Sequence, residues 1–305
     1  MSHTETYASC YTHLIAGAYD LHMQISPDIM PRKLNDTQMA QRIIDAGMAG
    51  FSMRSHYYCT GERAQLVNQH FNTKVNAVGS LVLNQPVGGI NPTAVEIAAR
   101  SNTKLIWFPT QDATHARKVL KSGKPIEKLP HWARIVLEME AEGVAAPSID
   151  ILDEEGRLIP QVYDVLDIIA KRNLTLVTGN ISPKEAFALV KEAHARKVDR
   201  ILIALVDHPA TNYSIEEQKQ LLAYGAMMEH CYNTWAGGKC ELEESIAQIK
   251  AIGPEHVVIS SDLGQPSGIF PDEGMLHYAA ELSKAGFSDT QIQHMLAKNP
   301  ASLIS

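Results

Sequence analysis

The chain has 305 residues, of which 45% are hydrophobic and 20% charged, with a formal net charge of −7 and an isoelectric point near 6.0. A chain of this length is enough for one α/β barrel. The negative net charge and the absence of any Lys/Arg run argue against nucleic-acid binding. A polar start, no apolar run of the roughly 20 residues that cross a membrane, and scattered cysteines without a CxxC pair predict a cytoplasmic protein with reduced thiols. The cysteines are Cys10, Cys59, Cys231 and Cys240.

Strand-like and helix-like segments alternate along the chain, and this order predicts βα units around a parallel sheet. The expected strands are 18–24, 50–56, 76–83, 104–108, 174–180, 200–206, 226–231 and 256–261. The expected helices are 36–46, 61–71, 91–100, 161–171, 182–195, 214–223, 241–252, 272–285 and 289–297. Asn35 or Asp36 caps the first of these helices, and Pro92 stands in the first turn of another. Ser182 and Ser214 each precede a Glu by three residues, which is typical of a helix start.

Eight strands that alternate with helices are the number found in a (β/α)8 TIM barrel, which is an α/β fold. We therefore predict a single barrel over residues 1–305, with an open doubly wound sheet as the alternative. The dinucleotide-binding form of that sheet is disfavoured because no GxGxxG motif follows the first strand. Residues 110–160 interrupt the alternation with polar, irregular sequence, helical periodicity at 132–140 and a turn sequence at 153–156. We interpret them as an insertion after the fourth strand that forms a lid or an oligomer contact.

In such a barrel the chemistry lies where strands end and the βα loops begin. Period-two alternation puts His22 and Gln24 on the same side of the first strand. Neutral imidazole and carboxylate are the usual ligands of Zn²⁺, and a bound ion would lower the pKa of its water towards about 7. A lone loop histidine nevertheless packs or faces solvent more often than it binds a metal. The polar residues at the expected strand ends are His22, Gln24, Arg54, His56, Thr178, Asn180, Asp207, His208, Glu229, His230, Ser261 and Asp262.

Short motifs through nearly the whole chain resemble those of one enzyme superfamily. They are Asp20-Leu21-His22-Met23-Gln24 with Ser26-Pro27-Asp28, Arg54-Ser55-His56-Tyr57, Asn91-Pro92 with Trp107-Phe108-Pro109-Thr110, Thr178-Gly179-Asn180-Ile181-Ser182-Pro183, Asp207-His208-Pro209, Ser260-Ser261-Asp262-Leu263-Gly264-Gln265 and Asn299-Pro300. Together they resemble the amidohydrolase superfamily of metal-dependent hydrolases, and more narrowly an uncharacterised amidohydrolase-like branch of it. The resemblance implies a (β/α)8 barrel with one or two divalent ions at its C-terminal mouth. It also implies hydrolysis of amides, lactones or related esters, and less often deamination, decarboxylation or hydration.

The chain departs from the family pattern at three ligand positions. The family's first strand carries His-x-His, where this chain has His22-Met23-Gln24. Relatives in the branch carry Lys in the second-strand motif, where this chain has Arg54, and their Thr-Gly-His motif ends here in Asn180. A neutral amide is a poor zinc ligand, and Arg stays protonated, so it cannot bind an ion.

The ligands that remain predict one divalent ion at most, Zn or Mn, held by His22, His208 and Asp262. A pocket without metal is the alternative. In either case Asp262, together with His208 or His56, is the expected catalytic acid/base group.

Arg54, Gln24 and Asn180 are hydrogen-bond donors that do not titrate near neutral pH, so we expect them to bind substrate in an anion pocket. Arg54 would bind a carboxylate or stabilise an oxyanion, and its purely structural alternative is a salt bridge to Asp262. The predicted function is hydrolysis of a small, anionic amide, cyclic amide or lactone. The alternatives are a metal-independent lyase, isomerase or decarboxylase that uses Arg54 and Asp262, and a non-catalytic ligand-binding relative. We expect a homo-oligomer from base rates alone, with no nucleic-acid or membrane partner.

Overall fold

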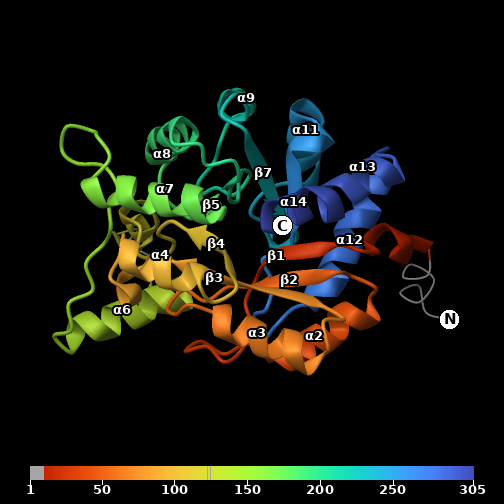
Figure 1. Ribbon diagram of the computed structural model, residues 1–305, viewed down its shortest axis with the longest axis horizontal. Coiled ribbons are helices and arrows are strands. Elements are labelled where there is room, and N and C mark those ends of the chain that lie inside the picture. Colours follow the sequence, from red (N-terminus) through yellow and green to blue (C-terminus); the bar gives the residue numbers. More distant parts are fainter. Residues whose placement is uncertain (1–9, 122, 124) are drawn as a thin grey trace.

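The sheet at the centre of the molecule has eight parallel strands in sequence order. The structure is a computed structural model that describes residues 10–121, 123 and 125–305. Every neighbouring pair from β1 to β8 is parallel, and Figure 1 shows the strands in the middle with helices around them. The strands are β1 (Tyr19–Met23), β2 (Gly50–Met53), β3 (Asn76–Val82), β4 (Thr103–Trp107), β5 (Thr175–Val177), β6 (Ile201–Ile203), β7 (Ala226–Cys231) and β8 (Val257–Ser260).

The sheet closes where β1 meets the segment after β8. Met23 forms a parallel bridge with Leu263, and the Gln24 N–H donates to the Leu263 carbonyl at 3.0 Å. The Asp262 N–H donates to the His22 carbonyl at 2.8 Å. The predicted (β/α)8 barrel is therefore confirmed, and the open doubly wound sheet is wrong. The closure also places His22 beside Asp262, from opposite ends of the chain.

Helices alternate with the strands, and their starts follow the expected capping residues. Asn35 caps α2 in a capping box with Gln38, and Ser182 and Ser214 form the same arrangement with the Glu three residues on. None of the helices of the described residues combines the length and apolarity that a membrane crossing requires. The helices are α2 (Asp36–Asp45), α3 (Gly61–His70), α4 (Pro92–Ala99), α5 (Thr114–Arg117), α6 (His131–Ala141), α7 (Pro160–Arg172), α8 (Pro183–Ala195), α9 (Ile215–Leu222), α10 (Tyr232–Ala236), α11 (Leu242–Ile252), α12 (Pro271–Lys284), α13 (Asp289–Gln293) and α14 (Asn299–Ile304), with short 3₁₀ segments η1 (Thr12–Ile15), η2 (Gln85–Val87), η3 (Lys118–Lys121), η4 (Ile126–Lys128) and η5 (Pro254–His256) and a π-helical segment η6 (His294–Lys298).

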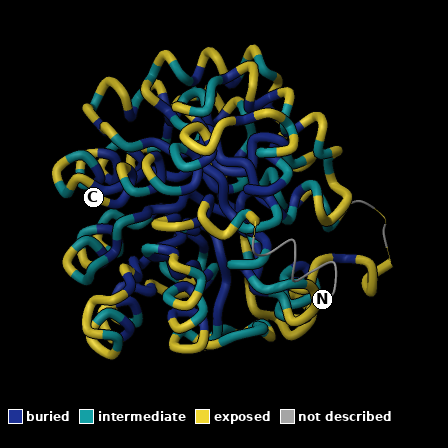
Figure 2. Tube along the Cα trace, turned by 90° about the vertical axis from the view of Figure 1, so that its right-hand side faces the viewer, coloured by how far each residue is buried: buried dark blue, intermediate teal, exposed yellow. Residues whose placement is uncertain are grey.

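Apolar side chains fill both the barrel interior and the layer between strands and helices. Figure 2 shows buried residues in the centre and exposed ones on the outer turns. Inside the barrel, Leu21, Leu105, Val177 and Val258 pack around Trp107, which is fully buried. These side chains fill the barrel interior, so the space for a ligand lies at the mouth, where the carboxyl ends of the strands meet.

β5 and β6 are shorter than predicted because the backbone turns early. Gly179, after β5, has φ +65°, and a Cβ there would lie 2.3 Å from the Phe108 carbonyl oxygen. Leu205, after β6, has φ +55°. Left-handed backbone cannot continue a strand, so both strands end and their following residues form turns at the mouth.

Residues 110–160, the predicted insertion, contain α5 and α6 and a short hairpin. Leu152 forms an antiparallel bridge with Leu158, and the Gly156 N–H donates to the Asp153 carbonyl at 3.0 Å, which is the expected turn. The helix expected at 289–297 is interrupted, because a π-helical turn separates α13 from α14.

Candidate active site at the mouth of the barrel

A cavity of about 880 Å³ lies at the carboxyl ends of the strands. Its volume is in the range of small-molecule sites. Strand ends supply one part of its wall, and the insertion supplies another through Leu129, Trp132 and Arg134. The residues to which sequence reasoning assigned metal, catalytic or substrate roles all line it: His22, Gln24, Arg54, His56, Asn180, His208 and Asp262.

Asp262, at the bottom of the cavity, contacts four polar side chains. Its Oδ1 accepts from Gln24 Nε2 at 3.0 Å and lies 3.1 Å from His22 Nε2 and 3.5 Å from Arg54 Nη2. Its Oδ2 accepts from Asn233 Nδ2 at 3.3 Å. Burial alone would raise the pKa of this carboxyl, but the charges of His22 and Arg54 hold it well below its usual value. Asp262 is therefore ionised at neutral pH and is surrounded by hydrogen-bond donors and cations.

His22 lies between two carboxylates and is fully buried. Its Nδ1 lies 3.0 Å from Glu229 Oε2, and the other Glu229 oxygen accepts from the Ser260 hydroxyl at 2.8 Å. Burial and the Arg54 charge lower the pKa of His22, but Glu229 and Asp262 outweigh them and leave it raised. The arrangement fits an imidazolium that donates to Glu229 from Nδ1, while its Nε2 forms an ion pair with Asp262 but has no hydrogen-bond partner among the described residues.

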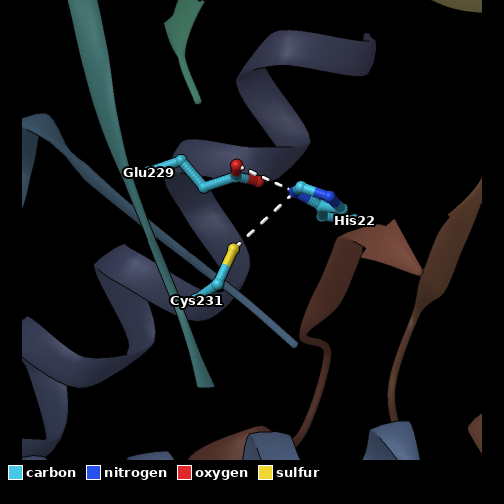
Figure 3. Close-up of side chains that lie close together, drawn as sticks. All are labelled: His22, Glu229 and Cys231. Carbon is cyan, nitrogen blue, oxygen red and sulfur yellow. Dashed lines mark hydrogen bonds and ion pairs between the residues drawn. The ribbon is translucent and has the colours of Figure 1, made fainter. Parts of the chain in front are cut away.

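Figure 3 shows a group of possible metal ligands, His22, Glu229 and Cys231, of which His22 also lines the cavity. Their ligand atoms lie within 4.8 Å of one another, and all three residues are buried. However, the His22 and Glu229 atoms are already hydrogen-bonded to each other, and burial raises the pKa of the Cys231 thiol well above its usual value. The trio would have to lose the thiol proton and the His22–Glu229 hydrogen bond before it could hold a divalent ion, so it fits one poorly.

The predicted metal set at the mouth does not fit a divalent ion either. The Arg54 guanidinium and the amide of Gln24 point donors at the Asp262 oxygen that would bind it. The Nδ1 of His208 accepts from the Ala210 N–H at 3.0 Å, so the proton of this imidazole is on Nε2. A cation at this point would face a guanidinium and N–H groups in place of lone pairs.

Arg54 lines the cavity although it is only 4% exposed. Its guanidinium lies over the Trp107 ring at 4.9 Å. It makes the 3.5 Å ion pair with Asp262, yet within the part of the chain that the structure describes its Nε has no hydrogen-bond partner. Burial lowers the pKa of Arg54, but an arginine remains charged at any working pH. Arg54 therefore forms the salt bridge to Asp262 that we expected of a purely structural role, and its Nε still lacks a partner among the described residues.

His56 and His208 are neutral donors. The Thr110 hydroxyl lies 2.8 Å from His56 Nδ1 and already accepts from Asn84 Nδ2, so we assign its proton to the His56 contact and the imidazole proton to Nε2. Burial and the charges of Arg54 and Arg32 hold the pKa of His56 well below its usual value. Burial, aided by Lys239, lowers the pKa of His208 to about 4.

Gln24 and Asn180 differ in how far the protein uses their amides. Gln24 donates to Asp262 and accepts from Arg32 Nη1 at 3.1 Å, so it joins two charged groups. Arg32 is in turn held by Asp28, with 2.6 Å between Nε and Oδ2. The side-chain oxygen of Asn180 is buried and, over residues 10–121, 123 and 125–305, has no hydrogen-bond partner. Asn180 therefore lines the cavity with an amide whose oxygen no described group satisfies.

Asp207 and His230 stood among the strand ends but do not line the cavity. His230 Nδ1 lies 2.8 Å from Asp207 Oδ2, which also accepts from the Ser245 hydroxyl of α11 at 2.5 Å. Alternation explains this, because Glu229 and Cys231 face inward on β7 and His230 between them faces the helices.

The cavity wall is strongly cationic, although the whole chain is acidic. Asp262 is the one carboxylate among the described residues that line it. Sequence reasoning missed most of the cations, because loops and the insertion bring them in without a local pattern. The lysines and arginines of the wall are Arg32, Arg54, Lys128, Arg134 and Lys239.

Several solved structures share this fold over almost their whole length. An amidohydrolase from Pseudomonas aeruginosa is similar with a TM-score of 0.64 and 10% identity, over 96% of this chain and 97% of that chain. The probable dipeptidase PvdM from the same organism has a TM-score of 0.64 and 13% identity, over 98% and 97%. An organophosphorus hydrolase from Deinococcus radiodurans has a TM-score of 0.56 and 13% identity, over 97% and 94%. The chain therefore shares its barrel fold with these three proteins.

No curated protein matches the sequence significantly. A family model does match residues 17–229, which run from just before β1 into β7 and include every predicted site residue except Asp262. This chain therefore belongs to the family described as a family of unknown function, DUF6282.

Proposed function

We propose that this chain is an enzyme that hydrolyses a small, anionic amide, cyclic amide or lactone in the cavity, without a divalent ion. The observation that carries the proposal is the surroundings of Asp262. His22, Arg54, Gln24 and Asn233 direct donors at the carboxylate where an ion would bind. The fold shared with hydrolases and the cationic wall support the reaction class and the charge of the substrate.

In the proposed reaction, water attacks the carbonyl carbon and its proton passes to Asp262. Negative charge develops on the carbonyl oxygen, which Arg54 and the Nε2–H groups of His56 and His208 stabilise. Asp262 then returns the proton to the leaving nitrogen or oxygen as the bond to carbon breaks. A neutral imidazole is a very weak acid, so we propose hydrogen bonding for both histidines in place of the expected acid/base role. Asn180 would orient the substrate, and Gln24 would hold Asp262.

The low pKa of Asp262 favours a second candidate, because a carboxylate of low pKa is a weak base. In a metal-independent decarboxylase, lyase or isomerase, Arg54 would stabilise an enolate. Such a reaction depends less on a strong base than hydrolysis does. The product separates the two: hydrolysis adds water to the substrate, whereas decarboxylation removes carbon dioxide. A relative that only binds its ligand would give neither.

The insertion supports the proposal as a lid. Leu129, Trp132 and Arg134, from α6 and just before it, line the cavity, which favours the lid over the oligomer contact. A cytoplasmic location and a homo-oligomeric state stay predictions of the sequence.

Metal analysis tests the proposal directly. Protein purified without a histidine tag should contain far less than one equivalent of zinc or manganese, and chelation should change neither its melting temperature nor its turnover of carboxylate-bearing amides and lactones. Mass spectrometry of the products identifies the reaction. One equivalent of metal that disappears in Asp262→Asn, or activity that requires added metal, would refute the metal-free proposal.

His208 should make stability depend on pH. Its pKa is about 4 in the folded chain and 6.5 in an unfolded one, so between these values the unfolded state binds the additional proton. The free energy of unfolding should therefore fall as the pH drops from about 6.5 towards about 4. His208→Gln should show a shallower fall in urea titrations across this window, while His70→Gln, an exposed control on α3, should follow the wild type. Equal slopes in all three proteins would contradict the assignment.

A further inference from the structure

Arg134 on α6 is a cation that lines the cavity without a carboxylate partner. Its Nε is buried and has no hydrogen-bond partner among the residues that the structure describes, and no described carboxylate lies within ion-pair distance of it. Arg134 as a whole is only half-buried, whereas Arg117, the buried arginine of the insertion, pairs with Asp112 at 2.5 Å. An N–H group that loses water without gaining a hydrogen-bond partner raises the free energy of the fold, so the unpartnered Nε of Arg134 in the cavity wall points to a ligand.

The cavity therefore has two separate cationic groups. Arg54 follows β2 and lies against Asp262 at the bottom. Arg134 comes from the insertion, with the exposed Lys128 of η4 in the same wall. Each guanidinium presents a planar fork that matches one carboxylate. Apolar side chains of the same wall, Leu129 and Trp132, suit the carbon chain between two such groups.

We propose that Arg134 forms a second anion subsite that binds a carboxylate of the substrate. Arg54 contacts the scissile carbonyl and then the carboxylate that hydrolysis forms there, so the acyl product held in this cavity is a dicarboxylate. This inference rests on the proposed function, because it assigns the substrate class of the same site. It adds that the insertion supplies specificity for length and charge, and that a substrate without a carboxylate at Arg134, or a product with a single carboxylate, binds more weakly.

Titration calorimetry with acids of matched carbon chain tests the proposal on the intact protein. Glutarate and adipate should bind about tenfold or more tightly than butyrate and hexanoate, which is the gain from one charge-assisted pair. Arg134→Gln should lower the affinity for the two dicarboxylates to the level of the monocarboxylates and leave the monocarboxylate affinities unchanged. Arg134→Lys keeps the charge but loses the fork, so its dicarboxylate affinity should be intermediate.

Arg157→Gln is the matched control, because Arg157 is an exposed arginine of the insertion that pairs with Asp153 and Glu155 outside the cavity. It should bind every acid as the wild type does. Equal affinity of wild type for the mono- and dicarboxylates, or an equal loss of both in Arg134→Gln, would overturn the second subsite. If instead Arg54→Gln leaves all affinities unchanged, the proposed function fails and not only the second subsite. Melting curves of both Arg134 variants confirm folding, and Arg134→Lys answers the question if Arg134→Gln does not fold.

Discussion

Arg54→Met should reduce kcat/KM by about a hundredfold or more, the usual effect of removing one donor to a developing oxyanion. The guanidinium is the group in the cavity that combines a permanent charge, deep burial and donors without protein partners. Methionine fills a similar volume against Trp107 and should preserve the packing of the barrel mouth. Arg54→Lys should recover only a small part of the activity, since an ammonium cannot reproduce the planar fork.

The measurement is steady-state kinetics on any substrate found in the amide and lactone panel, with circular dichroism to confirm folding. Arg157→Met removes an exposed arginine outside the cavity and should leave kcat/KM unchanged. A variant at Arg54 that keeps kcat/KM within a few fold of wild type would leave Arg54 with only its structural role beside Asp262.

The sequence predicted the barrel and the residues of its mouth through two simple rules. Strand ends carry the chemistry of a barrel, and side chains alternate along a strand. His22 and Gln24 satisfy both rules, and the structure places both against the same oxygen of Asp262. Their partner lies after the last strand, so only closure of the barrel, which the strand count implied, brings the three together.

These two rules do not identify a site residue where two adjacent residues of a strand are both polar. They also do not identify one that comes from a loop or from the insertion. On β7, Glu229 and His230 are adjacent polar residues, and only the register of the closed barrel shows that Glu229 faces His22. Arg134 lies on α6. The periodicity of this segment predicts a helix, but it does not predict that the helix packs over the cavity. Lys239 follows α10, a short helix that propensity did not indicate. Long-range packing decides all three positions.

Asp262→Asn should destabilise the protein by about 3–5 kcal/mol at neutral pH, the usual cost of removing one member of a buried ion pair. In the wild type the half-buried Asp262 and the buried Glu229 face the buried cations His22 and Arg54. The variant leaves two cations with one carboxylate. Because the folded pKa of Asp262 lies below its ordinary value of 3.8, the stabilisation is complete above that pH and is lost as the pH falls below it. Urea unfolding at several pH values should show this acid loss in the wild type and not in the variant.

The double variant Asp262→Asn with Arg54→Met tests whether charge balance is the reason. Removing one cation together with the anion restores a balance of one imidazolium and one carboxylate, so the double variant should be more stable than the sum of the single effects predicts. Asp199→Asn changes an exposed carboxylate and should alter the free energy of unfolding by less than about 0.5 kcal/mol. Additive effects in the cycle would mean that Asp262 stabilises the mouth through its hydrogen bonds to Gln24 and Asn233 and not through charge. The cationic character of the cavity would then have to be explained by its ligand alone, which returns the question to Arg54 and Arg134.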